Sequence, residues 1–276
     1  MMRRRTFAPV LLALGAAVLA VAALPAPAQQ GSDADAQLRE YREMLAEDNP
    51  ADLTAARGEE LWKTRRGPRN ASLERCDLGL GAGVVKGAYA QLPRYFADTD
   101  KVMDLEQRLI YCMVNLQGMN AAEITRRPFG SPEHKSDFEA LVAWIASESK
   151  GMKVNVSTAN PKEMEAYLVG EQMFYRRAGP YDFACATCHS EQGKRIRLQD
   201  LPDLATPAGA GASWTTWPAY RVSQGEVRTM QHRLFDCYRQ MRHPQAAYAS
   251  DGLTALQMYL AKTANGAIMN APAVKR

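Results

Sequence analysis

Three apolar stretches stand out along the chain. The first, residues 7–24, is a nearly continuous apolar run close to the N-terminus. The other two, residues 138–151 and 253–266, repeat apolar positions with a helical period, and each ends at a glycine. Apolar residues that recur every three to four positions form one face of an amphipathic helix, which packs against a core. The pattern therefore predicts one core helix late in each half of the chain.

Two shorter helices are predicted earlier in each half, around a Gly-Glu pair. They span residues 58–64 and 170–177, where apolar positions again recur at helical spacing. A stretch rich in Ala, Gly and Pro, residues 205–211, predicts a flexible loop. The chain of 276 residues is 46% hydrophobic and 23% charged, an ordinary composition for one or two globular domains. We therefore expect a mainly α fold with long loops.

The N-terminal apolar run has the features of a secretory signal peptide. Three arginines, residues 3–5, precede it, and the small residues 26–28 offer a cleavage site. An uncleaved membrane anchor is the alternative, although the run is near the lower length limit for a spanning helix. We expect residues 1–28 to be removed near Ala28 on export to the periplasm, which leaves residues 29–50 as a polar N-terminal arm.

Removal of this peptide changes the net charge. The full chain has 34 basic and 30 acidic residues, which gives a formal charge of +4. Residues 1–28 contain three arginines and no acid, so 31 basic residues remain against 30 acidic ones. A charge so close to zero gives no electrostatic basis for binding nucleic acid or an anionic membrane. We therefore expect an exported protein that binds no nucleic acid and, after cleavage, no membrane.

The strongest local motif is Cys-Ala-Thr-Cys-His at residues 185–189. In c-type haem attachment, two thiols such as Cys185 and Cys188 bond to the haem vinyl groups, and the following histidine, here His189, ligates the iron. A redox dithiol and half of a zinc site are the alternatives. A zinc site needs a second ligand pair, and the other histidines offer no such spacing. The motif therefore predicts one covalently bound haem c.

The second axial ligand of this haem is not determined by the motif. In c-type cytochromes it is typically a Met or a second His from the region downstream. The candidates in this chain are Met230, His232, Cys237, Met241, His243 and Met258. Composition does not choose among them, so further information is needed.

An internal repeat supplies that information. Residues 58–76 and 170–188 share Gly, Gly and Cys at intervals of nine. Residues 93–112 and 218–237 share a Pro and a Cys that are nineteen positions apart. Together with the two apolar helix patterns, these matches occur in the same order in both halves and predict a duplicated domain.

The repeat also predicts the fold of each half. A helix is followed by a loop with the haem-type cysteine, and an apolar helix ends the copy, which is the layout of a small cytochrome c domain. We expect two cytochrome c-like domains related by internal duplication, over residues 51–152 and 153–276.

Only the second copy has the residues for haem attachment. Cys76 takes the place of Cys188, but Asp77 stands where the ligating histidine would be, and Leu73 stands where the other thiol would be. We therefore expect the N-terminal domain to carry no haem.

The repeat pairs Cys112 with Cys237. If Cys237 points at the iron of the second copy, Cys112 points at the centre of the first copy, close to Cys76. In an oxidising compartment these two thiols would form a disulfide. Two free buried thiols are the alternative.

Cys237 is then left unpaired and opposite the haem. A buried structural cysteine is one interpretation, because free Cys often packs as a small hydrophobic residue. Three arginines lie near it in sequence, and Arg233 precedes it by one helical turn. Cationic neighbours favour the thiolate, and they also attract a small oxyanion, so Arg239 and Arg242 are further candidates for anion binding.

These motifs together resemble the SoxA family, the A subunits of the SoxAX cytochromes of bacterial sulfur oxidation. The resemblance covers roughly residues 50–265. It is carried by residues 72–79 (Ser-Leu-Glu-Arg-Cys-Asp-Leu-Gly), 92–96 (Leu-Pro-Arg-Tyr-Phe), 185–189 and 233–237.

The resemblance implies an L-cysteine S-thiosulfotransferase that joins thiosulfate oxidatively to a cysteine of the SoxYZ carrier. It implies a heterodimer with a SoxX-type monohaem cytochrome. It further implies that His189 and the sulfur of Cys237, often a persulfide, are the axial ligands and that Arg233 is an active-site arginine. Some members carry a second haem in the N-terminal domain. This chain departs from them at Asp77 and resembles the single-haem type.

Two other functions remain open at this point. A plain electron-transfer cytochrome would place Met241 or His243 opposite His189 and would have no substrate chemistry. A haem scaffold for a partner would use Cys237 only as a buried residue. Arg108 precedes Cys112 as Arg233 precedes Cys237, so the arginine could be structural in both copies.

Overall fold

The computed structural model describes the chain except residues 1–35, 38–39, 42, 46, 197–198 and 276. Residues 41–276 form one compact unit, to which all that follows belongs, and residues 1–40 form another. The predicted signal peptide over residues 1–28 lies outside the described residues, as do parts of the arm over residues 29–50. In the part of the chain that is described, no helix is long and apolar enough to cross a membrane.

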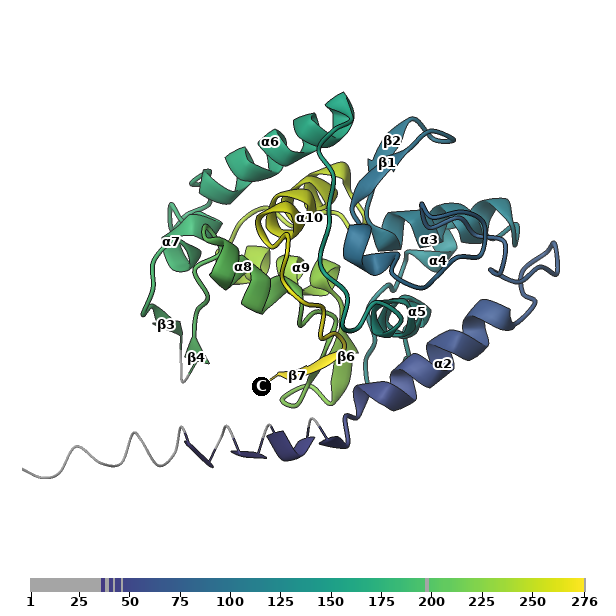
Figure 1. The fold of residues 1–276 in the computed structure, drawn as a ribbon, viewed down its shortest axis with the longest axis horizontal. Coiled ribbons are helices and arrows are strands. Elements are labelled where there is room, and N and C mark those ends of the chain that lie inside the picture. The colour runs from purple at the N-terminus through teal and green to yellow at the C-terminus, as the bar shows by residue number, and fades with distance from the viewer. Residues whose placement is uncertain (1–35, 38–39, 42, 46, 197–198, 276) are drawn as a thin grey trace, which may run out of the picture. The chain divides into compact units, whose positions relative to one another are not determined.

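The unit is mainly helical, and part of its order of elements occurs twice, once in each copy (Figure 1). The first copy contains α2 (Ala51–Lys63), the 3-10 helix η1 (Tyr89–Gln91), β1 (Arg94–Phe96), β2 (Lys101–Met103), α3 (Leu105–Asn115), α4 (Ala121–Ile124) and α5 (Asp137–Ser147). The second copy contains α6 (Pro161–Tyr175), α7 (Cys185–His189), β3 (Arg195–Ile196), β4 (Gln199–Asp200), α8 (Pro207–Trp214), β5 (Ala219–Arg221), β6 (Glu226–Arg228), α9 (Met230–Gln240), α10 (Asp251–Thr263) and β7 (Ala273–Lys275).

The first and last long helices of each copy cross closely at a glycine. In Figure 1, α2 lies beside α5, and α6 lies beside α10. A Cβ atom at Gly58 would lie 2.0 Å from the carbonyl oxygen of Ala140, and one at Gly170 would lie 1.9 Å from that of Ala255. Only a residue without a side chain allows this approach. The predicted helices around these glycines start earlier than expected, at Ala51 and Pro161, because each glycine marks the crossing and not the helix start.

A short hairpin and a capped helix form the middle of each copy. Strand β1 pairs antiparallel with β2, and β5 pairs with β6 in the equivalent register. The side chain of Asp104 then accepts a hydrogen bond from the backbone N–H of Gln107, and Thr229 accepts one from that of His232. Such N-caps satisfy backbone donors that the first helical turn leaves free. The caps therefore set where α3 and α9 begin.

One continuous apolar core runs through both copies. The predicted core helices supply much of it, with Leu141 and Ile145 from α5 and Leu256 and Met258 from α10, all fully buried. The apolar pattern over residues 138–151 and 253–266 is thus confirmed as two buried helices.

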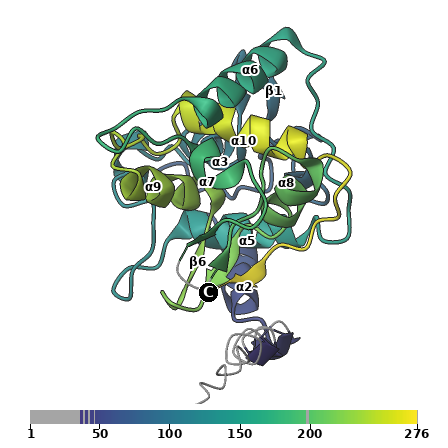
Figure 2. The same cartoon turned by 90° about the vertical axis from the view of Figure 1, so that its left-hand side faces the viewer.

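The prediction of a flexible loop over residues 205–211 is wrong. Helix α8 begins at Pro207, and the Thr206 hydroxyl accepts a hydrogen bond from the Gly209 N–H at 3.2 Å. A Cβ atom at Gly209 would lie 1.9 Å from the carbonyl oxygen of Asp203. The small residues therefore serve close packing. Figure 2 turns the second copy towards the viewer, so that α7, α8, α9 and α10 are seen together.

Candidate haem-binding site

The second copy contains a cavity of about 460 Å³ that brings sulfur, imidazole and guanidinium groups together. Cys185, Cys188 and His189 line it, and so do Arg233 and Cys237. Apolar side chains complete much of the wall: Phe174, Trp217, Leu234, Leu256 and Leu260. An apolar cavity with a few convergent polar groups is the usual form of a cofactor site.

Helix α7 presents the attachment motif. Its residues Cys185, Cys188 and His189 are three and four positions apart, which places them on one face of the helix. Before the helix, the backbone N–H of Ala184 donates to the Thr187 hydroxyl at 2.9 Å. The helical turn thus holds two thiols and one imidazole towards the same cavity, as covalent attachment of haem requires.

His189 is held in the orientation of an iron ligand. Its Nδ1 lies 3.0 Å from the carbonyl oxygen of Pro202, which can only accept, so Nδ1 carries the proton. Nε2 is then left as the atom that could coordinate a metal, and a hydrogen bond from the other ring nitrogen is typical of metal-binding histidines. Burial lowers the pKa of His189, which favours the neutral imidazole that ligates iron.

Helix α9 supplies another part of the wall. Met230, Arg233, Leu234, Cys237 and Met241 line the cavity, and their spacing of three or four residues marks one helical face. The donor set of the cavity, two thiols and one imidazole from α7 and sulfur atoms from α9 and its C-cap, fits a covalently attached haem with histidine and sulfur as iron ligands.

Three of the six candidate second ligands lie elsewhere. Met258 is fully buried in the core of α10. His232 packs edge-on against Phe129 at 4.7 Å, and burial lowers its pKa to about 4. His243 points at the carbonyl oxygen of Phe183, 3.0 Å from Nε2. Met230, Cys237 and Met241 remain at the cavity wall.

Two effects act on the pKa of the Cys237 thiol in opposite directions. Cys237 is a free cysteine, and burial raises its pKa, while the charge of Arg233 acts in the opposite direction. The arginine effect has the direction expected from the sequence, but burial outweighs it. An uncoordinated Cys237 thiol therefore keeps its proton, whereas coordination to a metal would remove it.

Arg233 and its repeat partner Arg108 have different surroundings. Arg108 is only 3% exposed, and it donates to the carbonyl oxygen of Asp77 at 2.6 Å and pairs with the carboxylate of Asp98 at 2.8 Å. Its guanidinium also lies 4.1 Å from the ring centroid of Phe96.

At Arg233 these partners have been replaced. The repeat puts Arg221 where the first copy has Phe96, and Ser223 where it has Asp98. Arg233 has a weak ion pair with Asp236, at 3.5 Å, and its side chain is 27% exposed. The structural role of Arg108 is thus not repeated, and the Arg233 guanidinium is available at the cavity wall.

The other basic residues of the cavity were missed by sequence reasoning. Arg221 and Lys275, on neighbouring strands β5 and β7, line the cavity. Arg239 and Arg242, which the sequence suggested, do not line it. Arg239 is exposed and pairs with Asp236 at 2.6 Å, and Arg242 is exposed after the end of α9. Nearness in sequence was misleading, because a residue two positions after Cys237 lies on another helical face.

In the first copy, Cys76 and Cys112 form a disulfide, with a Cα–Cα distance of 5.6 Å. Both are buried, and the neighbouring Leu73 and Leu78 are fully buried. The expected disulfide is thus present, and the alternative of two free thiols is wrong.

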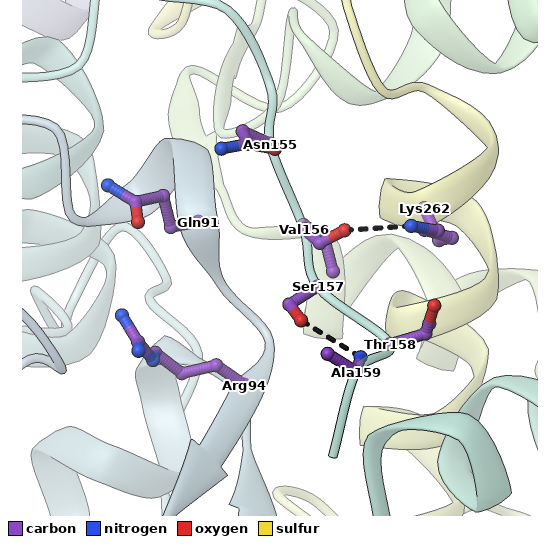
Figure 3. Close-up of a pocket in the computed structure, with 8 residues that line it drawn as sticks. All are labelled: Gln91, Arg94, Asn155, Val156, Ser157, Thr158, Ala159 and Lys262. Atoms are coloured by element: carbon purple, nitrogen blue, oxygen red, sulfur yellow. Dashed lines mark hydrogen bonds between the residues drawn. The ribbon is translucent and has the colours of Figure 1, made fainter. Parts of the chain in front are cut away.

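A second cavity, of about 520 Å³, lies along residues 155–159, which connect the two copies (Figure 3). Lys262 donates to the carbonyl oxygen of Val156 at 3.2 Å, while the side chains of Gln91 and Arg94 point away from the connection. Its wall contains no cysteine or histidine, so it offers no ligand set for a haem.

Comparison with known proteins gives a consistent result. The family model described as "SoxA/TsdA, cytochrome c domain" matches twice, over residues 57–154 and 169–269. This confirms two cytochrome c-like domains. The chain is 52% identical to the L-cysteine S-thiosulfotransferase subunit SoxA of Hydrogenophilus thermoluteolus over 87% of both chains. It is 34% identical to a subunit of the same name from Hydrogenobacter thermophilus over the full length of both.

A solved structure has the same fold. The crystal structure of SoxXA from P. pantotrophus superposes with a TM-score of 0.70 at 25% sequence identity. The match covers 86% of this chain and 84% of the other chain.

Proposed function

The chain belongs to the SoxA/TsdA cytochrome c family, and from this premise we propose that it is the A subunit of an L-cysteine S-thiosulfotransferase. We propose that it joins thiosulfate to a cysteine of the SoxYZ carrier protein. The observation that carries the proposal is that Arg233 and Cys237 face the same cavity as the haem attachment motif. A pure electron carrier has no need of a thiol and guanidinium groups at that place.

The cytochrome c family implies haem c, and we propose a single haem bound through Cys185 and Cys188. His189 and the sulfur of Cys237 would be its axial ligands, while Asp77 leaves the first copy without a ligating histidine. When bound, the haem supplies an iron that accepts electrons and withdraws charge from a sulfur ligand. The N–H of His189 keeps the imidazole oriented through Pro202.

Thiosulfate is a dianion, and the cavity offers it cationic groups. Arg233, Arg221 and Lys275 all line the cavity, and the pKa of Arg221 is lowered by burial and by the nearby Arg233. An anion would relieve this repulsion between the guanidinium groups, and charge-assisted hydrogen bonds would orient its sulfonate oxygens. The outer sulfur would then be directed towards the Cys237 sulfur.

The proposed reaction forms one S–S bond between the carrier cysteine and the outer sulfur of thiosulfate. The carrier thiol and thiosulfate together lose two electrons and one proton, and the product is a cysteine S-thiosulfonate with one negative charge. The two electrons would have to leave through c-type haem, which is the electron acceptor that the proposed assembly would supply. Cys237 would hold the sulfonated unit before the carrier thiolate displaces it, by the logic of thiol–disulfide exchange.

The same proposal assigns the assembly and location. We propose a heterodimer with a SoxX-type monohaem cytochrome in the periplasm, after removal of residues 1–28. We also propose residues 51–152 as the domain without haem and residues 153–276 as the haem-binding domain.

The test is a comparison of the exported wild-type complex with Cys237→Met. The substituted protein should keep its covalent haem, by intact mass, but should lose thiosulfate coupling to the carrier. Full coupling activity in Cys237→Met would exclude the proposed role.

Met230 and Met241 also line the cavity, so a plain electron-transfer cytochrome is the second candidate. It predicts a methionine ligand, whose optical and magnetic spectra differ from those of a thiolate ligand. A wild-type spectrum with methionine ligation would favour this second function.

A further inference from the structure

The start of helix α9 is held by carboxyl groups that belong to the first copy. Asp104, Glu106 and Glu139 are each at most 3% exposed. Each accepts a hydrogen bond from a residue between positions 228 and 231, at the junction of β6 and α9. Buried carboxyls are rare unless they are paired, so this cluster needs an explanation.

Asp104 joins helices α9 and α10 of the second copy. Its Oδ2 accepts hydrogen bonds from the side-chain amides of Gln231, at 2.5 Å, and Gln257. The Gln231 side chain in turn accepts from the backbone N–H of Ala249 at 3.3 Å. One carboxyl therefore links the first turn of α9 to α10.

Glu106 contacts the N-cap itself. Its Oε1 accepts from the Thr229 hydroxyl at 3.0 Å and from the Tyr248 hydroxyl at 3.1 Å. The Thr229 oxygen is also the acceptor for the His232 N–H at 3.2 Å. A continuous chain of hydrogen bonds thus runs from Glu106 through the cap into the first turn of α9.

Glu139 holds the strand that precedes the helix. Its Oε1 accepts from Arg228 at 2.9 Å, and its Oε2 accepts from the Gly130 N–H at 2.9 Å. Arg228 also donates to the Gly130 carbonyl oxygen at 3.0 Å. The loop that contains Gly130 places Phe129 against His232 of α9.

The contacts are reciprocal between the two copies. In the repeat, Asp104 is equivalent to Thr229, and Glu106 is equivalent to Gln231. Asp104 contacts Gln231, and Glu106 contacts Thr229, so equivalent positions exchange partners across the junction. The surrounding elements follow the same rule, because α5 contacts β6 while α10 contacts β2. This is the pattern of a two-fold symmetric interface.

We propose that Glu106, with Asp104, is a positioning residue that fixes the start of α9 and thereby the place of Arg233 and Cys237. Thr229 lies eight residues before Cys237, about 12 Å along the helix at the usual rise per residue. A rigid helix transmits a shift or tilt of its first turn to both side chains. Displacements of about 1 Å in a reactive centre can lower rates by about 100-fold.

Hydrogen bonding, and not packing alone, is the property to be tested. Burial and the neighbouring Asp104 raise the pKa of Glu106 well above its usual value. Glu106→Gln therefore resembles the native group in charge and shape, and it keeps an acceptor oxygen for both hydroxyls. Glu106→Leu has a similar volume but no acceptor, so it leaves the Thr229 and Tyr248 hydroxyls buried without this partner. Leu141→Ala is the matched control, because it weakens the core of the first copy without removing a polar contact to α9.

The first readout is amide hydrogen exchange of α9, compared with α10, in the haem-loaded protein. Glu106→Leu should speed exchange of residues 230–235 at least tenfold, while Glu106→Gln stays within about threefold of wild type. Leu141→Ala should leave the ratio of the exchange rates of α9 and α10 unchanged. If Glu106→Leu and Leu141→Ala have matched melting temperatures and the same ratio of α9 to α10 exchange rates, the proposal is overturned.

The second readout rests on the proposed function. Glu106→Leu should lower kcat for thiosulfate coupling, expressed per haem, about tenfold. Leu141→Ala should leave it unchanged. If wild type fails to couple thiosulfate, the proposed function is wrong, and hydrogen exchange still decides the positioning role. If Glu106→Leu does not fold, Glu106→Met replaces it, because the Met thioether is only a weak acceptor. Faster α9 exchange in Glu106→Met than in Glu106→Gln supports the proposal, and equal exchange in both overturns it.

Discussion

At the scale of single residues, two arginines at equivalent positions have different surroundings. Arg108 is enclosed by the carboxylate of Asp98 and the ring of Phe96, whereas Arg233 faces a cavity beside Arg221. The difference comes from the neighbours, because the arginine itself is the same in both copies. A guanidinium without a strong intramolecular partner is free to bind an anion.

Arg233→Gln should therefore impair thiosulfate coupling through substrate binding. Loss of charge-assisted hydrogen bonds predicts a fall in kcat/KM of about 10- to 100-fold, mainly through KM. Steady-state kinetics with thiosulfate would measure it. Arg239→Gln is the matched control on the same helix, because Arg239 is exposed and does not line the cavity. An equal effect of both substitutions would contradict the role of Arg233.

Glu139 predicts a pH dependence of stability. Burial raises its pKa from 4.5 to about 7, although Arg228 opposes the shift. The folded state then binds more protons than the unfolded state between pH 4.5 and 7, so this carboxyl makes the free energy of unfolding fall as the pH rises through that window. Below pH 4.5 it is protonated in both states, and its contribution no longer changes with pH.

Denaturant unfolding at several pH values tests this prediction. In wild type, Glu139 should make the free energy of unfolding fall by about 3 kcal/mol between pH 4.5 and 7. This fall should be absent in Glu139→Gln. The same substitution at an exposed carboxyl, Glu165→Gln, should leave the profile unchanged. A wild-type slope that survives in Glu139→Gln would show that other groups cause it.

At the scale of elements, the crossing of α6 and α10 depends on one missing side chain. Gly170→Ala would put a methyl group 1.9 Å from the carbonyl oxygen of Ala255. Because Gly170 and the Ala255 carbonyl lie where the two helices are in contact, the helices must separate, and we expect a loss of about 3 kcal/mol in unfolding free energy. Thermal or denaturant unfolding would measure it, with the exposed Glu165→Ala on α6 as the control. A change below about 0.5 kcal/mol would be inconsistent with the close crossing.

The sequence predicts these elements with uneven success. Helical periodicity and the repeated glycines identify α2, α5, α6 and α10, because such patterns are local and occur twice. Helix α8 was expected as a loop, because the requirement for Gly209 comes from the distant backbone at Asp203. The attachment motif identified one cavity wall, and Arg221 and Lys275 escaped notice because only pairing of β5 with β7 brings them to it.

At the scale of the whole described unit, covalent chemistry differs between the copies. The disulfide between Cys76 and Cys112 closes a span of 36 residues in the first copy. Constraint of the unfolded chain predicts a stabilisation of about 3–4 kcal/mol for a loop of this size.

Replacement of both cysteines by alanine should lower the unfolding free energy by about this amount, without changing the haem content of the second copy. Denaturant unfolding and intact mass would measure the two effects. Loss of the haem in the double variant would show that the copies are not independent in this respect.

The reciprocal contacts at the start of α3 and α9 have an evolutionary consequence. Exchange of partners between equivalent positions is what two identical chains would make, as expected if a homodimer became one chain by gene fusion. Fusion removes the need for the two halves to stay alike. With the function proposed above, one half could then have become a scaffold held by a disulfide, while the other half kept the residues for haem attachment and the Cys237 thiol.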